Sequence, residues 1–184
     1  MSTAQTLMFI RHGEKPGEHG GPHGVNHHGE ADPHSLSVRG WTRAGALAAL
    51  FGHASSASDG IVTPQRVVAT KASEKAKSRR EVDTATPTAK RLALDLDERY
   101  GHGDEAALAT DLMDAGHDAL IVWHHGNLPE LLSHLPIANR ADVPSAWPED
   151  RFDLIWVLTR SGDAYAFAQV DQDLLDGDQV RGSG

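Results

Sequence analysis

The sequence has no cysteine among its 184 residues, so the protein forms no disulfide and uses no thiolate as a nucleophile or a metal ligand. The absence of disulfides fits the cytoplasm, where we expect this protein. The chain also lacks an apolar run of transmembrane length. Its N-terminus, MSTAQTLMFIRHGE, has neither the charged start nor the long apolar run of a signal peptide.

Positive charge is scarce as well. Lysine and arginine number 17 against 26 acidic residues, and the net charge is -9 with histidine neutral. This balance argues against nucleic acids and anionic membranes as partners, so any anion site must be local. A hydrophobic content of 39% and a charged content of 23% are typical of a folded globular protein. We predict a single domain over residues 1–184, with a flexible tail at 181–184.

Short apolar runs alternate with stretches of helical periodicity along the chain. The predicted strands are 7–10, 67–70, 119–123, 154–158 and 164–170. The first predicted helix begins after Ser37, and three more cover 81–96, 105–116 and 128–135. Ser37 and Asp104 are expected to cap their helices, and Pro87 is expected to kink or restart the second helix. This order predicts an α/β fold of three layers (αβα), with a mostly parallel central sheet and a C-terminal antiparallel hairpin at its edge.

The segment 13–35 is rich in glycine and histidine and shows neither helical nor strand periodicity. We predict a long loop at the active site, because such loops in compact domains are usually functional or disordered. Its five histidines are irregularly spaced and have no accompanying Asp, Glu or Cys pattern for a tetrahedral metal site. We therefore favour a flexible lid over a metal site and predict no bound metal.

Three predicted strands are followed by cationic or titratable pairs, in the second case after a loop. These pairs are Arg11–His12, Arg79–Arg80 and His124–His125. The carboxyl ends of parallel strands meet at one edge of a sheet, where ligands bind in open α/β folds. A phosphate dianion would offset the repulsion among these groups, since arginine binds its oxygens through two parallel hydrogen bonds. A neutral histidine in such a site is also a nucleophile toward phosphorus.

Four segments in order resemble the histidine phosphatase superfamily, the phosphoglycerate mutase-like fold, and in particular its small bacterial members. The segments are FIRHGEK, LSVRGWTRAGALAALF, SRREVDTATPTAKRLAL and LIVWHHGNLPELL, which span most of residues 7–135. The resemblance implies a phosphohydrolase that needs no metal or other cofactor and works through a phosphohistidine intermediate. Its expected substrates are phosphorylated small molecules or phosphoproteins, including phosphohistidine.

The resemblance also implies individual roles. His12 would be the nucleophile and Arg11 a phosphate clamp. An arginine four residues before Thr-Ala selects Arg80 over Arg79, and the motif His-Gly-Asn selects His125 over His124. Because neighbouring residues on a strand point oppositely, one of these two histidines is expected to be structural. The residues expected to contribute to substrate binding are Glu14, Arg79, His124 and Asn127.

No residue clearly matches the loop glutamate that donates a proton in many members of this superfamily. Glu14, Glu74 and His124 are weak substitutes, which leaves the general acid open. Three alternatives therefore stand beside the phosphohydrolase. They are a phosphotransferase of the mutase type, which the short chain disfavours, a catalytically weak phosphate-binding module, and a metal-binding protein centred on residues 19–34.

Overall fold

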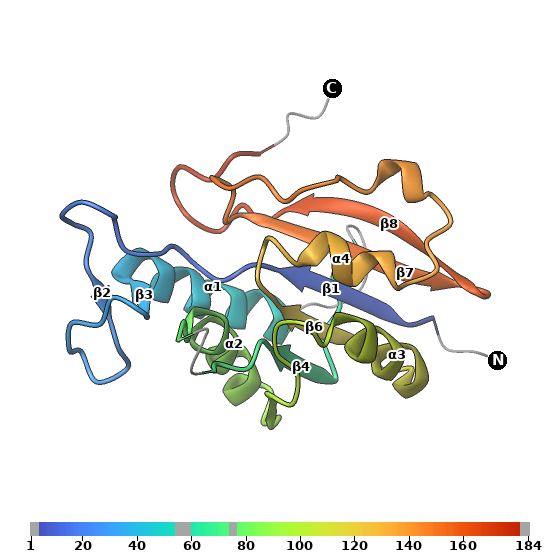
Figure 1. The fold of residues 1–184 in the computed structure, drawn as a ribbon, viewed down its shortest axis with the longest axis horizontal. Helices are drawn as coiled ribbons and strands as arrows, with labels where there is room; N and C mark the ends of the chain where they lie inside the picture. The colour runs from blue at the N-terminus through green and yellow to red at the C-terminus, as the bar shows by residue number, and fades with distance from the viewer. Residues whose placement is uncertain (1–3, 54–59, 74–76, 181–184) are drawn as a thin grey trace.

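A six-stranded sheet forms the centre of the molecule (Figure 1). The computed structural model describes residues 4–53, 60–73 and 77–180. The strand order is β5-β4-β6-β1-β7-β8, in which the first four strands are parallel and β7 and β8 form an antiparallel hairpin at one edge. The strands are β1 (Thr6–Ile10), β4 (Arg66–Ala69), β5 (Leu96–Asp97), β6 (Ala119–Val122), β7 (Leu154–Ser161) and β8 (Ala164–Asp171).

Helices cover both faces of this sheet. They are α1 (Val38–His53), α2 (Arg80–Arg91), α3 (Glu105–Ala115) and α4 (Leu128–Ser133), and a 3-10 helix spans Arg140–Asp142. Alternate residues of β1 point to opposite faces, so Leu7 and Phe9 join a core with α3 and α4, whereas Met8 and Ile10 join a core with α1 and α2. The predicted three-layer α/β fold with an antiparallel edge hairpin is confirmed.

The prediction was wrong about the end of the second helix. We expected the helix to reach residue 96, but α2 ends at Arg91 and residues 96–97 form β5. Ala93 takes a left-handed conformation with φ 54°. The N–H of Leu94 then donates to the carbonyl of Ala89 at 2.9 Å, which closes the helix. Pro87 does not restart α2, because the helix runs through it from Arg80 to Arg91.

The segment 13–35 has more regular structure than predicted. Gly24–Val25 forms β2, which pairs antiparallel with β3 (Leu36–Ser37) just before α1. A pair of two-residue strands leaves no periodicity to detect in the sequence. This segment lies at the end of the molecule to which β1 points, on the left in Figure 1.

The two predicted caps differ. Ser37 caps α1, because its Oγ accepts the N–H of Gly40 at 3.2 Å. Asp104 occupies the N-cap position of α3 as predicted, but its side chain makes no capping hydrogen bond, since its carboxylate accepts the N–H of Gly101 at 2.8 Å instead. Within the described residues no helix is both long and apolar enough to cross a membrane. The predicted tail at 181–184 and Glu74 lie outside the described residues.

Candidate active site

The predicted residues come together because β4, β6 and β1 are adjacent and parallel. Arg11 and His12 follow β1 directly, and His124 and His125 lie just beyond the end of β6. Arg80 is the first residue of α2, which follows β4 after a loop. All of these residues therefore lie at the carboxyl edge of the sheet, where α/β folds bind their ligands.

His12 is held in one tautomer by the backbone of the next residue, Gly13. Its side chain is 4% exposed, and Nδ1 lies 2.7 Å from the carbonyl oxygen of Gly13. A carbonyl oxygen can only accept, so Nδ1 carries the proton and Nε2 keeps its lone pair. The N–H of Gly13 donates to Thr84 Oγ1 at 2.9 Å, which ties this turn to α2.

The surroundings of His12 disfavour its charged form. Burial is the largest cause and lowers the pKa of His12 to about 3. The positive charges of Arg11 and Arg80 act in the same direction, as does His125, whereas the bond to Gly13 opposes them. His12 is therefore a neutral imidazole with a free nitrogen at physiological pH.

Two glycines allow the turn that carries His12 to lie against α1. A Cβ on Gly13 would lie 2.8 Å from the carbonyl oxygen of Gly40, and a Cβ on Gly40 would collide with the backbone of Glu14. This contact gives a physical reason for glycine in both RHGE and SVRG.

Arg11 is buried, with 2% of its surface exposed. One terminal nitrogen donates to the carbonyl of Glu149 at 2.6 Å, and the guanidinium carbon lies 4.0 Å from the ring centroid of Phe152. Burial lowers the pKa of Arg11 to about 10, so it stays charged at neutral pH. Its Nε is buried and has no hydrogen-bond partner within the described residues.

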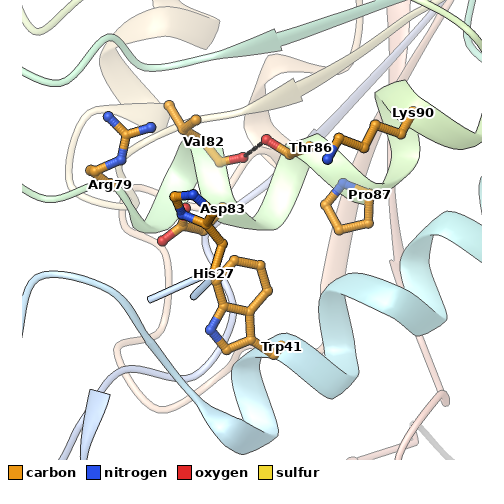
Figure 2. A pocket seen from close by; sticks show the side chains of 8 residues that line it. All are labelled: His27, Trp41, Arg79, Val82, Asp83, Thr86, Pro87 and Lys90. Atoms are coloured by element: carbon orange, nitrogen blue, oxygen red, sulfur yellow. Dashed lines mark hydrogen bonds between the residues drawn. The ribbon is translucent and has the colours of Figure 1, made fainter. Parts of the chain in front are cut away.

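The two neighbouring arginines at the start of α2 have different surroundings. Arg80 donates from Nε to the carbonyl of Ser35 at 3.1 Å and from Nη2 to that of Pro33 at 2.7 Å. Its charge is one of those that lower the pKa of His12. Arg79 instead lines a separate cavity on another face of α2 (Figure 2). The structure thus brings Arg80, but not Arg79, into the group around His12.

Both histidines after β6 lie on the same side, contrary to the expectation that they point oppositely. Their ring centroids are 4.6 Å apart, because the residues lie in a turn rather than in the strand itself. The ring of His125 meets that of His12 edge-on, with centroids 6.3 Å apart. Its Nδ1 is buried and lacks a hydrogen-bond partner in the part of the chain that is described. Burial lowers the pKa of His125 to about 4.

His124 belongs to a chain of hydrogen bonds behind His125. Asn127 donates from its amide to Glu105 at 2.9 Å, so its amide oxygen faces Nδ1 of His124 at 3.1 Å. Glu105 also accepts the indole N–H of Trp123 at 3.2 Å. Glu105 therefore orients Asn127, which in turn orients His124. Sequence reasoning missed Glu105, because nothing in the pattern of α3 separates it from surface glutamates.

Glu81 is a second functional candidate that sequence reasoning missed. It is 3% exposed, and burial raises the pKa of its carboxyl group. It lies close enough to Arg11 that its charge is the strongest one acting to raise the pKa of that arginine. Glu14, by contrast, is paired with Arg43 at 2.8 Å and with Arg39 at 3.1 Å. The one signal in the sequence for Glu81 is its position directly after Arg80, a predicted site residue.

Among the described residues, no group of three or more His, Asp or Glu side chains is arranged to hold a metal ion. Of the loop histidines, His27 lines the cavity beside Arg79, and it is exposed like the others.

The chain matches no protein-family model and no curated protein sequence. Its fold is similar to that of ecdysone phosphate phosphatase, EPPase, from Bombix mori, which was solved in complex with tungstate. The TM-score is 0.54 at 13% sequence identity, and the match covers 89% of this chain and 92% of that chain. A likeness at this identity shows that the two chains share a fold.

Proposed function

We propose that this protein is a phosphohydrolase of the histidine phosphatase superfamily, which cleaves phosphomonoesters through a phosphohistidine intermediate on His12. The observation that carries the proposal is the orientation of His12. Its Nδ1 is held by Gly13 while Nε2 stays free, at a sheet edge that also gathers Arg11, Arg80 and His125. The fold shared with a phosphatase that binds tungstate, a tetrahedral oxyanion like phosphate, supports the same function.

In the first step, Nε2 of His12 attacks phosphorus, and the bond from phosphorus to the leaving oxygen breaks. The phosphorylated ring keeps its proton on Nδ1 and so gains positive charge, which the carbonyl of Gly13 stabilises at 2.7 Å. Arg11 and Arg80 are each anchored by backbone carbonyls and would direct their remaining N–H groups to the phosphoryl oxygens. Water then attacks phosphorus, which releases phosphate and restores neutral His12.

We propose Glu81 as the proton donor to the leaving oxygen. Its buried carboxyl group, whose pKa is raised, has a larger protonated fraction than an exposed glutamate, as a general acid requires. Its carboxylate would then accept the proton of the attacking water. In this role Glu81 takes the place of the three weak substitutes considered from sequence. One of them, Glu14, is already held in ion pairs.

Hydrolysis of p-nitrophenyl phosphate with a chelator present tests the proposal. We expect turnover by the wild-type protein and a loss of at least about 10³-fold in His12→Ala, because no other group on the turn supplies the nucleophile. His28→Ala is the matched control, since it removes an exposed loop histidine, and it should keep wild-type turnover. Equal turnover by wild type and His12→Ala would refute the proposed mechanism.

A further inference from the structure

A cavity of about 390 Å³ lies between α1, α2 and the loop that carries His27 (Figure 2). The residues that line it along α2 begin at Arg79, just before the helix, and run to Lys90 at helical spacing, so they form one face of the helix. Arg80 and Thr84, which serve the His12 site, lie on another face of α2. The cavity is therefore separate from the candidate active site.

The middle of this cavity is lined by apolar side chains, and a hydrogen bond fixes the largest of them in place. Trp41 contributes its indole ring, and Val82 and Pro87 contribute further apolar surface. The indole N–H of Trp41 donates to the carbonyl of Val25 at 2.7 Å, which fixes the ring in place. A fixed aromatic ring beside a helix face makes a slot suited to a flat apolar group.

Positive charge lies at both ends of this cavity. Arg79 and Lys90 are exposed, and within the described residues neither side chain makes a hydrogen bond or an ion pair. Asp83 is the one acidic residue in the lining, and its carboxylate accepts the hydroxyl of Ser35 at 2.6 Å. Burial raises the pKa of Asp83 and the nearby charge of Arg79 opposes this, so Asp83 offsets part of the positive charge. Two cations against one carboxylate still leave the slot positive in a chain of net charge -9, which matches an anionic ligand.

We propose that this cavity binds flat aromatic acids, with the ring between Trp41 and Pro87 and the acidic groups at Arg79 and Lys90. The volume admits a small organic molecule rather than a peptide segment. The proposal does not depend on phosphohydrolase activity, because it concerns equilibrium binding at residues that take no part in the proposed reaction.

The test is a titration of the whole protein with 2,6-naphthalenedicarboxylate, a flat dianion, followed by tryptophan fluorescence and by calorimetry. Trp41 is the one tryptophan that is not buried, because Trp123, Trp147 and Trp156 are each 3% exposed or less. We expect saturable quenching that disappears in Trp41→Phe. The matching neutral probe, 2,6-naphthalenedimethanol, should bind more weakly by about tenfold.

Charge-removing variants locate the site. Arg79→Ala and Lys90→Ala should each weaken binding of the dianion by roughly three- to tenfold, whereas Lys71→Ala, an exposed lysine outside the cavity, should leave it unchanged. Inorganic phosphate and tungstate, the probes for the His12 site, should not compete. The proposal is overturned by absence of saturable binding, by equal binding of the neutral probe, or by displacement with phosphate.

Discussion

At the residue scale, the chemistry assigned to His12 depends on one hydrogen bond. The 2.7 Å contact with Gly13 leaves Nε2 as the only nitrogen with a free lone pair. Neutral His12 needs no deprotonation before it attacks phosphorus, because its pKa is lowered to about 3. If protonation of His12 limits the rate, kcat/KM should therefore fall with decreasing pH only well below the ordinary pKa of histidine.

Sequence reasoning could reach some of these residues and not others. Arg11 and His12 follow an apolar run directly, so the end of the strand locates them. Glu81 and Glu105 are buried on helices, and the phase and tilt that bury them depend on packing against distant strands. The expectation that the two histidines after β6 point oppositely assumed extended backbone, but β6 ends at Val122 and both residues lie in the turn beyond it. The catalytic roles of these residues stay predictions.

Replacement of Glu81 by glutamine tests its role as proton donor. Glutamine keeps the shape of the side chain but cannot donate a proton as an acid, so the rate of hydrolysis should fall most for phosphate esters with poor leaving groups. We expect kcat to fall roughly 10²-fold or more for an alkyl phosphate and far less for p-nitrophenyl phosphate. Steady-state kinetics on both esters measure this difference. An equal loss on both would show that Glu81 is structural.

At the scale of elements, α2 holds the turn after β1 in place through a hydrogen bond. Thr84, on its second turn, accepts the N–H of Gly13 at 2.9 Å and donates to the carbonyl of Arg80 at 2.7 Å. The existence of α2 and of the strands β1, β4 and β6 was predictable, because hydrophobic periodicity is a local property of the sequence. The end of α2 at Ala93 was not, since a left-handed alanine follows from packing rather than from preference.

Two threonines on α2 allow a matched comparison. Thr84→Val leaves the N–H of Gly13 without an acceptor, so the free energy of unfolding should fall by about 1–3 kcal/mol. Thr88 is equally buried, but its hydroxyl has no partner within the described residues. Thr88→Val should therefore be neutral or stabilising. Urea denaturation measures the free energy of unfolding of both variants. An equal effect of the two substitutions would contradict the role given to Thr84.

At the scale of the whole molecule, one arginine joins three distant parts of the chain. Arg43 of α1 is 2% exposed and contacts Glu14 after β1 at 2.8 Å. It also contacts Asp178 at 2.6 Å and Gln172 at 2.8 Å, both beyond β8. This buried network connects the turn that carries His12 to the C-terminal segment.

Loss of Arg43 should destabilise the protein strongly. Arg43→Leu leaves the carboxylates of Glu14 and Asp178, of which Asp178 is 2% exposed, without their main partner, and we expect the free energy of unfolding to fall by roughly 3–5 kcal/mol. Arg39 pairs with the same two carboxylates, but its side chain is 47% exposed. Arg39→Leu should therefore cost less than about 1 kcal/mol. Denaturant melts of the two variants side by side give the answer, and similar losses would rule out a central role for Arg43.

The most direct test of the central claim is to trap the intermediate on the intact protein. Wild type, mixed rapidly with p-nitrophenyl phosphate and quenched in alkali, should gain the mass of one phosphoryl group, and peptide mapping should place it on His12. The adduct should be labile to acid, as a phosphoramidate is, and absent from His12→Ala. A phosphoryl group on another residue, or turnover that never labels the protein, would contradict the account.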